Sequence, residues 1–88
     1  MTDYILSNHA RDVLEEREIP EQWVWGTIKE PEKTWEGQDG NIHFARAISE
    51  RDNRILHVVV NPEVSPHRVV TVFFDRRLKG KKSDETQD

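Results

Sequence analysis

The sequence predicts an α+β fold in which two N-terminal helices pack on an antiparallel sheet of about four strands. Apolar residues recur at helical spacing up to residue 29 and alternate with a period of two from residue 33 onward. The helical segments come before the long strands, so no strand–helix–strand alternation exists to build a parallel sheet. The 88 residues suffice for one domain. We place it at residues 1–78 and expect residues 79–88 to be a disordered charged tail.

The two helices are predicted from caps and prolines. Ser7 is a good N-cap for a helix over 8–18, whose apolar residues are spaced for one buried face. Pro20 fits the first turn of a second helix over 20–29, and Pro31 disfavours helical angles in the residue before it. Residues 4–6 are a short apolar segment compatible with a brief edge strand.

The strands are predicted at 33–36, 41–48, 54–60 and 68–74. Along the second of these, Arg46 falls on the same face as Phe44, and His43 falls on the opposite face. The last two strands are apolar on both faces, which is typical of central strands. The four strands are connected by turns or loops over 37–40, 49–53 and 61–67.

Composition excludes several classes of site and protein. The chain has no cysteine, so a disulfide, a thiolate metal site and a cysteine nucleophile are excluded. It has no apolar run near 20 residues and begins with polar residues, so we expect a soluble cytoplasmic protein with no membrane association. The four histidines lack close metal-ligand spacing, so we expect neither metal nor cofactor.

Charge is strongly segregated along the chain. The net charge is −4, but residues 1–40 hold four Lys/Arg against ten Asp/Glu, residues 41–82 hold nine against four, and residues 83–88 hold three Asp/Glu and no Lys/Arg. A basic sheet region beside an acidic helical region suits a phosphate-bearing ligand on one side and a basic partner on the other. The alternative is a solvated surface whose asymmetry has no function.

Two arginines break the apolar pattern. On a regular helix Arg17 would fall inside the apolar stripe with His9 at its edge, and Arg46 shares the apolar face of its strand. Each guanidinium could extend to solvent along an apolar surface or pair with a carboxylate. If both arginines instead converge beside His9 in one solvated hollow, they would suit a phosphodiester, because Arg neutralises phosphate oxygens and His transfers protons near neutral pH.

For the remaining candidates the residue pattern alone favours structural interpretations. His43 and His57 each stand on a strand, where a single histidine is usually a hydrogen-bonded structural group. Thr71 fits the β-propensity of a buried strand. The three tryptophans fit contacts between helices and sheet, with one of them available for an interface.

Several short motifs together resemble a bacterial family of domains of unknown function. They are Ser7-Asn8-His9-Ala10, Arg17-Glu18-Ile19-Pro20, Pro31, His43-Phe44-Ala45-Arg46, Leu56-His57-Val58-Val59-Val60 and Val69-Val70-Thr71-Val72-Phe73. In their order and spacing they resemble the RelE/ParE-like group, within the barnase–EndoU–colicin–RelE fold of small ribonuclease toxins.

The resemblance implies RNA cleavage without metal, with the RNA 2′-hydroxyl as nucleophile. It places the catalytic group at His9, Arg17, Arg46 and Thr71. The sequence departs from RelE-type toxins, which often carry a catalytic tyrosine near the C-terminus, because the only tyrosine here is Tyr4. ParE-type relatives keep the fold without cleaving RNA.

Three functions follow as expectations. The first is a metal-independent, toxin-like endoribonuclease held by an antitoxin protein. The second is a catalytically inactive RelE-like module that binds or regulates a protein partner, and the third is a structural subunit that self-associates through its charged halves. The target RNA, the partner and the oligomeric state stay open.

Overall fold

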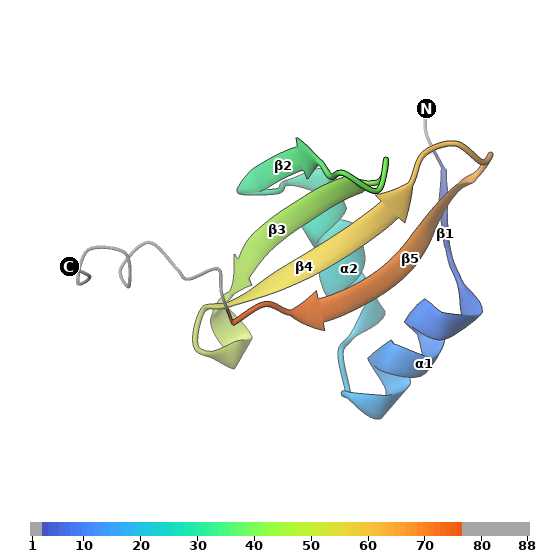
Figure 1. Cartoon of the computed structure of the whole chain (residues 1–88). Helices are drawn as coiled ribbons and strands as arrows, with labels where there is room; N and C mark the ends of the chain where they lie inside the picture. Colours follow the sequence, from blue (N-terminus) through green and yellow to red (C-terminus); the bar gives the residue numbers. More distant parts are fainter. Residues whose placement is uncertain (1–2, 77–88) are drawn as a thin grey trace.

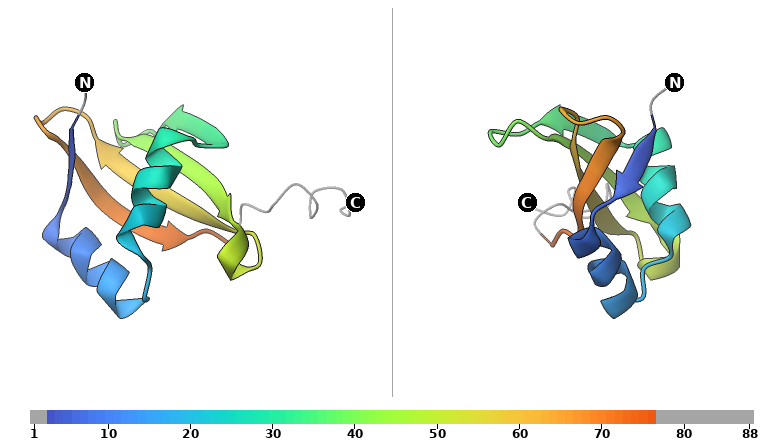
Figure 2. Two further views of the ribbon diagram at one scale, coloured as in Figure 1. Left: turned by 180° about the vertical axis from the view of Figure 1, so that it is seen from behind. Right: turned by 90° about the vertical axis from the view of Figure 1, so that its right-hand side faces the viewer.

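Both helices lie on the same side of a five-stranded sheet in the computed structural model, which describes residues 3–76 (Figures 1 and 2). The elements in chain order are β1 (Tyr4–Leu6), α1 (Asn8–Glu16), α2 (Glu21–Lys29), β2 (Lys33–Glu36), β3 (Ile42–Ile48), the 3₁₀ turn η1 (Ser49–Arg51), β4 (Arg54–Asn61) and β5 (His67–Phe74). The strand order across the sheet is β1-β5-β4-β3-β2. The tail predicted at 79–88 lies outside the described residues.

The predicted α+β class is confirmed, but the sheet has one strand more than predicted and is mixed. β2, β3, β4 and β5 pair antiparallel, whereas β1 runs parallel to β5 from Tyr4 opposite His67 to Leu6 opposite Val69. A strand of three residues is too short to show a period, and its partner lies more than sixty residues away along the chain. Local pattern therefore could not reveal this pairing.

The helices begin close to where they were predicted. The Ser7 hydroxyl accepts from the Ala10 amide at 3.0 Å, which confirms the N-cap. However, α1 ends at Glu16, two residues earlier than predicted, because Arg17 leaves helical angles and Glu18 adopts a left-handed φ of 56°. α2 follows an extended Pro20 and ends at Lys29, where Glu30 is extended ahead of Pro31.

The apolar core fills the space between the helices and one face of the sheet, here called the covered face. β4 runs between β3 and β5 and contributes the central side chains, of which Leu56 and Val58 are fully buried. The other buried members of this cluster are Leu6, Ala10, Leu14, Ile19, Val24, Ile48, Val60, Val69 and Val72. The predicted central position of the last two long strands is confirmed, since both have a neighbour on each side.

The opposite face, here called the open face, has no helix packed on it within residues 3–76 (Figure 2). Directly opposed residues on neighbouring strands share a face. One such row of the open face is Trp35, His43, Val59 and Thr71, and the next is Lys33, Ala45, His57 and Phe73. His43 and His57 therefore lie on the same face of the sheet, together with Lys33, Trp35 and Phe73.

Candidate active site on the open face of the sheet

Three side chains from neighbouring parts of the open face form one hydrogen-bonded chain. The Nδ1 atom of His57 lies 3.0 Å from the Asp75 carboxylate, and the Nε2 atom of His57 lies 2.8 Å from Nδ1 of His43. The side chains of Asp75 and His57 are only 4% and 6% exposed, and that of His43 is 15% exposed. The chain therefore runs from a buried carboxylate to an imidazole at the surface.

Taking the Asp75 carboxylate as ionised assigns the tautomers of both imidazoles. An ionised carboxylate only accepts, so Asp75 accepts from His57 Nδ1–H. His57 Nε2 then carries a lone pair and accepts from His43 Nδ1–H. The remaining nitrogen, His43 Nε2, is left as the end of the chain, where a proton can be taken up or released.

A second carboxylate faces that end. Asp39 Oδ1 lies 3.4 Å from His43 Nε2. The pKa of Asp39 is held below its ordinary value of 3.8, chiefly by the hydrogen bond from the Asn41 amide, with a further hydrogen bond from His43. Two carboxylates thus flank the two imidazoles.

The turn that carries Asp39 approaches the His43 ring closely. A Cβ atom at Gly37 would overlap His43 Nε2 and would lie 2.8 Å from Asp39 Oδ1. The ring occupies this position only because residue 37 has no side chain. Gly37 is thus a requirement of the site.

Aromatic rings from β2 and β5, the strands on either side of β3 and β4, enclose the histidines. Trp35 of β2 stacks on His43 with ring centroids 5.3 Å apart and an interplanar angle of 16°. Phe73 of β5 lies 4.6 Å from His57 on the other side. Packing against these rings limits ring rotation and supports the hydrogen-bonded geometry.

The comparison with known proteins identifies a family. A family model described as "Domain of unknown function (DUF4258)" matches residues 6–74. The chain belongs to the DUF4258 family. The match includes His43 and His57 and ends one residue before Asp75. No curated protein and no solved structure matches the chain.

The DUF4258 domain does not bring the four residues predicted from the sequence into one group. His9 and Arg17 are both exposed and sit at opposite ends of α1, about 12 Å apart along the axis. Arg17 precedes α2, whereas Arg46 donates to the Glu30 carbonyl just after α2, so about 13 Å of helix separates the two arginines. Arg17 escapes the apolar stripe because α1 has already ended there.

Thr71 lies on the other side of the sheet from Arg46. It opposes Val59 on the open face, while Arg46 opposes Leu56 on the covered face. Thr71 thus shares a face with the histidine chain, and Arg46 does not. The predicted opposite facing of His43 and Arg46 is confirmed.

Sequence reasoning missed the histidine chain because it considered each histidine by itself. The signal was present in the hairpin formed by β3 and β4. Counting outward from the loop over 49–53 sets Ala45 opposite His57, which leaves His43 on the adjacent row of the same face. Asp75 gave no such signal, because its position depends on where β5 ends.

Within residues 3–76, no group of three or more His, Asp or Glu side chains is arranged to hold a metal ion. Within the same residues, no helix is long and apolar enough to cross a membrane.

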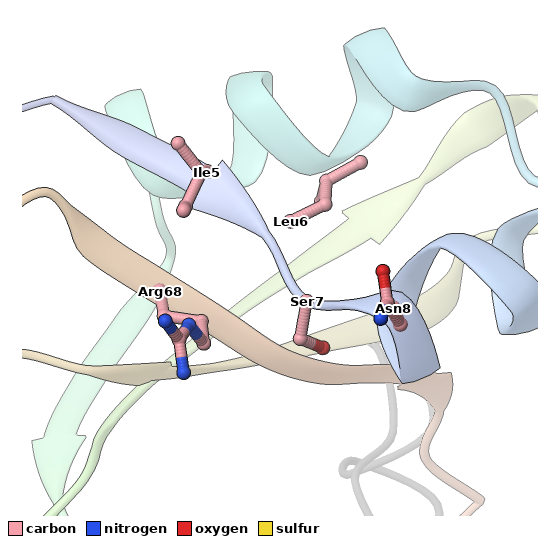
Figure 3. Close-up of a pocket in the computed structure, with 5 residues that line it drawn as sticks. All are labelled: Ile5, Leu6, Ser7, Asn8 and Arg68. Atoms are coloured by element: carbon pink, nitrogen blue, oxygen red, sulfur yellow. The ribbon is translucent and has the colours of Figure 1, made fainter.

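A shallow hollow of about 320 Å³ lies at a different place, where β1, β5 and the start of α1 meet (Figure 3). Its lining residues are Ile5, Leu6, Ser7, Asn8 and Arg68. The Ser7 hydroxyl already caps α1 and donates to the Val70 carbonyl at 3.0 Å. The hollow includes no member of the histidine chain.

Proposed function

We propose that this DUF4258 domain is a metal-independent endoribonuclease in which His43 is the catalytic residue and His57 and Asp75 position it. The observation that supports this is the chain from Asp75 through His57 to His43, which orients the His43 ring and directs Nε2 outward, where Asp39 Oδ1 lies 3.4 Å away. A general base needs a defined lone pair held in a fixed direction. A carboxylate behind an imidazole also stabilises the cation that forms after proton uptake.

The proposed reaction uses the RNA itself as nucleophile. His43 Nε2 removes the proton of a 2′-hydroxyl, and the 2′-oxygen forms a bond to the adjacent phosphorus while the bond from phosphorus to the 5′-oxygen breaks. The leaving 5′-oxygen takes a proton from water, and His43 later returns its own proton to solvent. The products are a 2′,3′-cyclic phosphate and a 5′-hydroxyl. Lys33, exposed on the same face, opposes the negative charge of the transition state.

The finer fold assignment and the biological setting are part of the same proposal. Two helices against antiparallel strands β2 to β5 suit a RelE/ParE-like domain. A toxin of this kind would act on RNA in the cytoplasm and be held by an antitoxin protein. Fold analogy alone does not decide function, so the site carries the argument.

A second candidate function is that of a catalytically inactive binding module on the same scaffold. The observation that favours it is the restricted access to His43, which is only 15% exposed and lies under the turn at Gly37. In this alternative the histidine chain fixes the strands, and the domain binds without cleaving.

Incubation of the pure full-length protein with total RNA in EDTA tests the first proposal. We expect discrete products that end in 2′,3′-cyclic phosphate, and a loss of about 10²- to 10⁴-fold in rate for His43→Ala, as for the removal of a general base. His67→Gln serves as the matched control, because His67 contacts Tyr4 outside the site.

The outcomes separate the candidates. Intact RNA after prolonged incubation with the folded protein would support the binding module and reject the enzyme. Cleavage that survives His43→Ala but is lost in His9→Ala or Arg17→Ala would show that the active site lies at α1 and not on the open face. Growth arrest on expression in cells, relieved by His43→Ala, is a second expected result.

A further inference from the structure

Four aromatic rings, one from each of four neighbouring strands, form a continuous row across the open face, here called the aromatic row. Its members are Trp35 of β2, His43 of β3, His57 of β4 and Phe73 of β5. Successive ring centroids lie 5.3, 5.0 and 4.6 Å apart. The row thus leads from the proposed catalytic imidazole to Phe73.

Phe73 is the exposed end of this row. Its relative exposure is 36%, whereas its neighbour His57 is 5% exposed. The last strand pair between β1 and β5 is Leu6 with Val69, so within residues 3–76 β5 has no neighbouring strand on its outer side beyond residue 69. A planar ligand can therefore reach the Phe73 ring from the edge of the sheet.

The charge of the strands on this face suits a polyanion. The charged side chains other than histidine that strands β1 to β5 direct to the open face are Lys33 and Arg68, and both are exposed. They stand on β2 and β5, on either side of the histidines. The two nearby carboxylates, Asp39 and Asp75, lie outside the strands and are hydrogen-bonded to the histidines. Their charge is thereby partly compensated.

We propose that Phe73 is a stacking platform for an unpaired nucleobase and that the domain selects single-stranded RNA through it. The proposal rests on the proposed function, since the base would belong to the strand cut at His43. An exposed ring on a sheet face stacks on splayed-out bases, while cations contact the backbone. Bases inside a duplex are stacked on each other and do not reach the ring.

Binding is measured with an RNA strand that lacks every 2′-hydroxyl nucleophile. We use a fluorescent, fully 2′-O-methylated strand of about 12 nucleotides, the same strand annealed to its complement, and a matched strand whose central nucleotides are abasic. Anisotropy titrations are run on the full-length protein at one salt concentration. The wild type is expected to bind the single strand most tightly, and the duplex and the abasic strand more weakly.

Two neighbouring phenylalanines supply matched variants. Phe73→Leu should weaken binding of the single strand about 5- to 150-fold, the range for loss of one base stack, and leave the abasic strand unaffected. Phe73→Tyr keeps a ring and should bind like the wild type. Phe74→Leu changes the same residue type on the covered face, where the Arg51 and Arg54 guanidiniums lie 5.6 and 5.1 Å from the Phe74 ring, and should not alter binding.

Equal affinity for single strand, duplex and abasic strand would overturn the inference, as would unchanged binding in a folded Phe73→Leu variant. If the wild type cleaves RNA but binds the abasic strand as tightly as the single strand, the proposed stacking site is wrong and the proposed nuclease activity is retained. If binding follows the expected pattern but no RNA is cut, the proposed nuclease activity is wrong and the proposed stacking site is retained.

Discussion

Along β4 the two faces of the sheet are buried to similar degrees by different physical means. On β4, Leu56 is 0% exposed on the covered face and His57 is 5% exposed on the open face. Leu56 is stabilised by removal of apolar surface from water. His57 must be hydrogen-bonded at both ring nitrogens to be buried at all, and it is. Burial alone therefore does not distinguish core from site, and the predictions below test the contrast.

The largest expected effect is on the covered face. Leu56→Ala leaves a cavity among fully buried side chains and should lower the free energy of unfolding by about 2–5 kcal/mol. Urea denaturation measures it. Ile5→Ala, at a 42% exposed position, is the control and should change stability by only about 0.5 kcal/mol. Similar losses for the two variants would contradict the assignment of the core.

A smaller loss of stability, with a change in tautomer, is expected on the open face. Asp75→Asn removes the carboxylate that accepts from His57 Nδ1–H and should lower stability by about 1–3 kcal/mol. Because the substituted amide can offer a donor instead, the preferred tautomer of His57 should change, and nitrogen NMR of the imidazoles measures this. Asp12→Asn, at an exposed position on α1, is the control. Unchanged imidazole spectra in Asp75→Asn would refute the hydrogen-bonded chain.

Substitutions at two glycines distinguish effects on the histidine site from effects on the rest of the fold. Gly37→Ala forces the His43 ring to move and should cost about 1 kcal/mol, with spectral changes confined to the open face. Gly26→Ala on α2 meets no atom within 4 Å and should stabilise the domain by about 0.5–1 kcal/mol. Two-dimensional amide NMR and urea denaturation check both. Spectral changes that spread through the core in Gly37→Ala would count against this separation.

The smallest effect concerns Asp39 and pH. Its folded-state pKa lies below 3.8, chiefly because the Asn41 amide donates to it. Its contribution to stability is therefore present above the unfolded pKa and is lost as pH falls through the folded pKa. Carboxyl NMR titration should show the depression, and most of it should persist in His43→Gln, because the Asn41 bond remains. A return to the ordinary pKa in that variant would show that His43 is the main cause.

Much of the architecture could be predicted from local pattern. The Ser7 cap, the interruption at Pro20 and Pro31, and the alternation along β3 each follow from the chemistry of neighbouring residues. Even the opposite facing of His43 and Arg46 followed from the period of two. Local pattern did not give the early end of α1, where a left-handed Glu18 stops the helix.

What the sequence by itself determined is the order of helices and strands and the face on which each strand residue lies, because both depend on repeats of two or 3.6 residues. Only the tertiary structure decided which residues meet. The pairing of β1 with β5, and the meeting of His43, His57 and Asp75, join residues far apart in the chain. Such contacts depend on sheet register and strand ends, which arise from packing of the whole domain and leave little trace in any single segment.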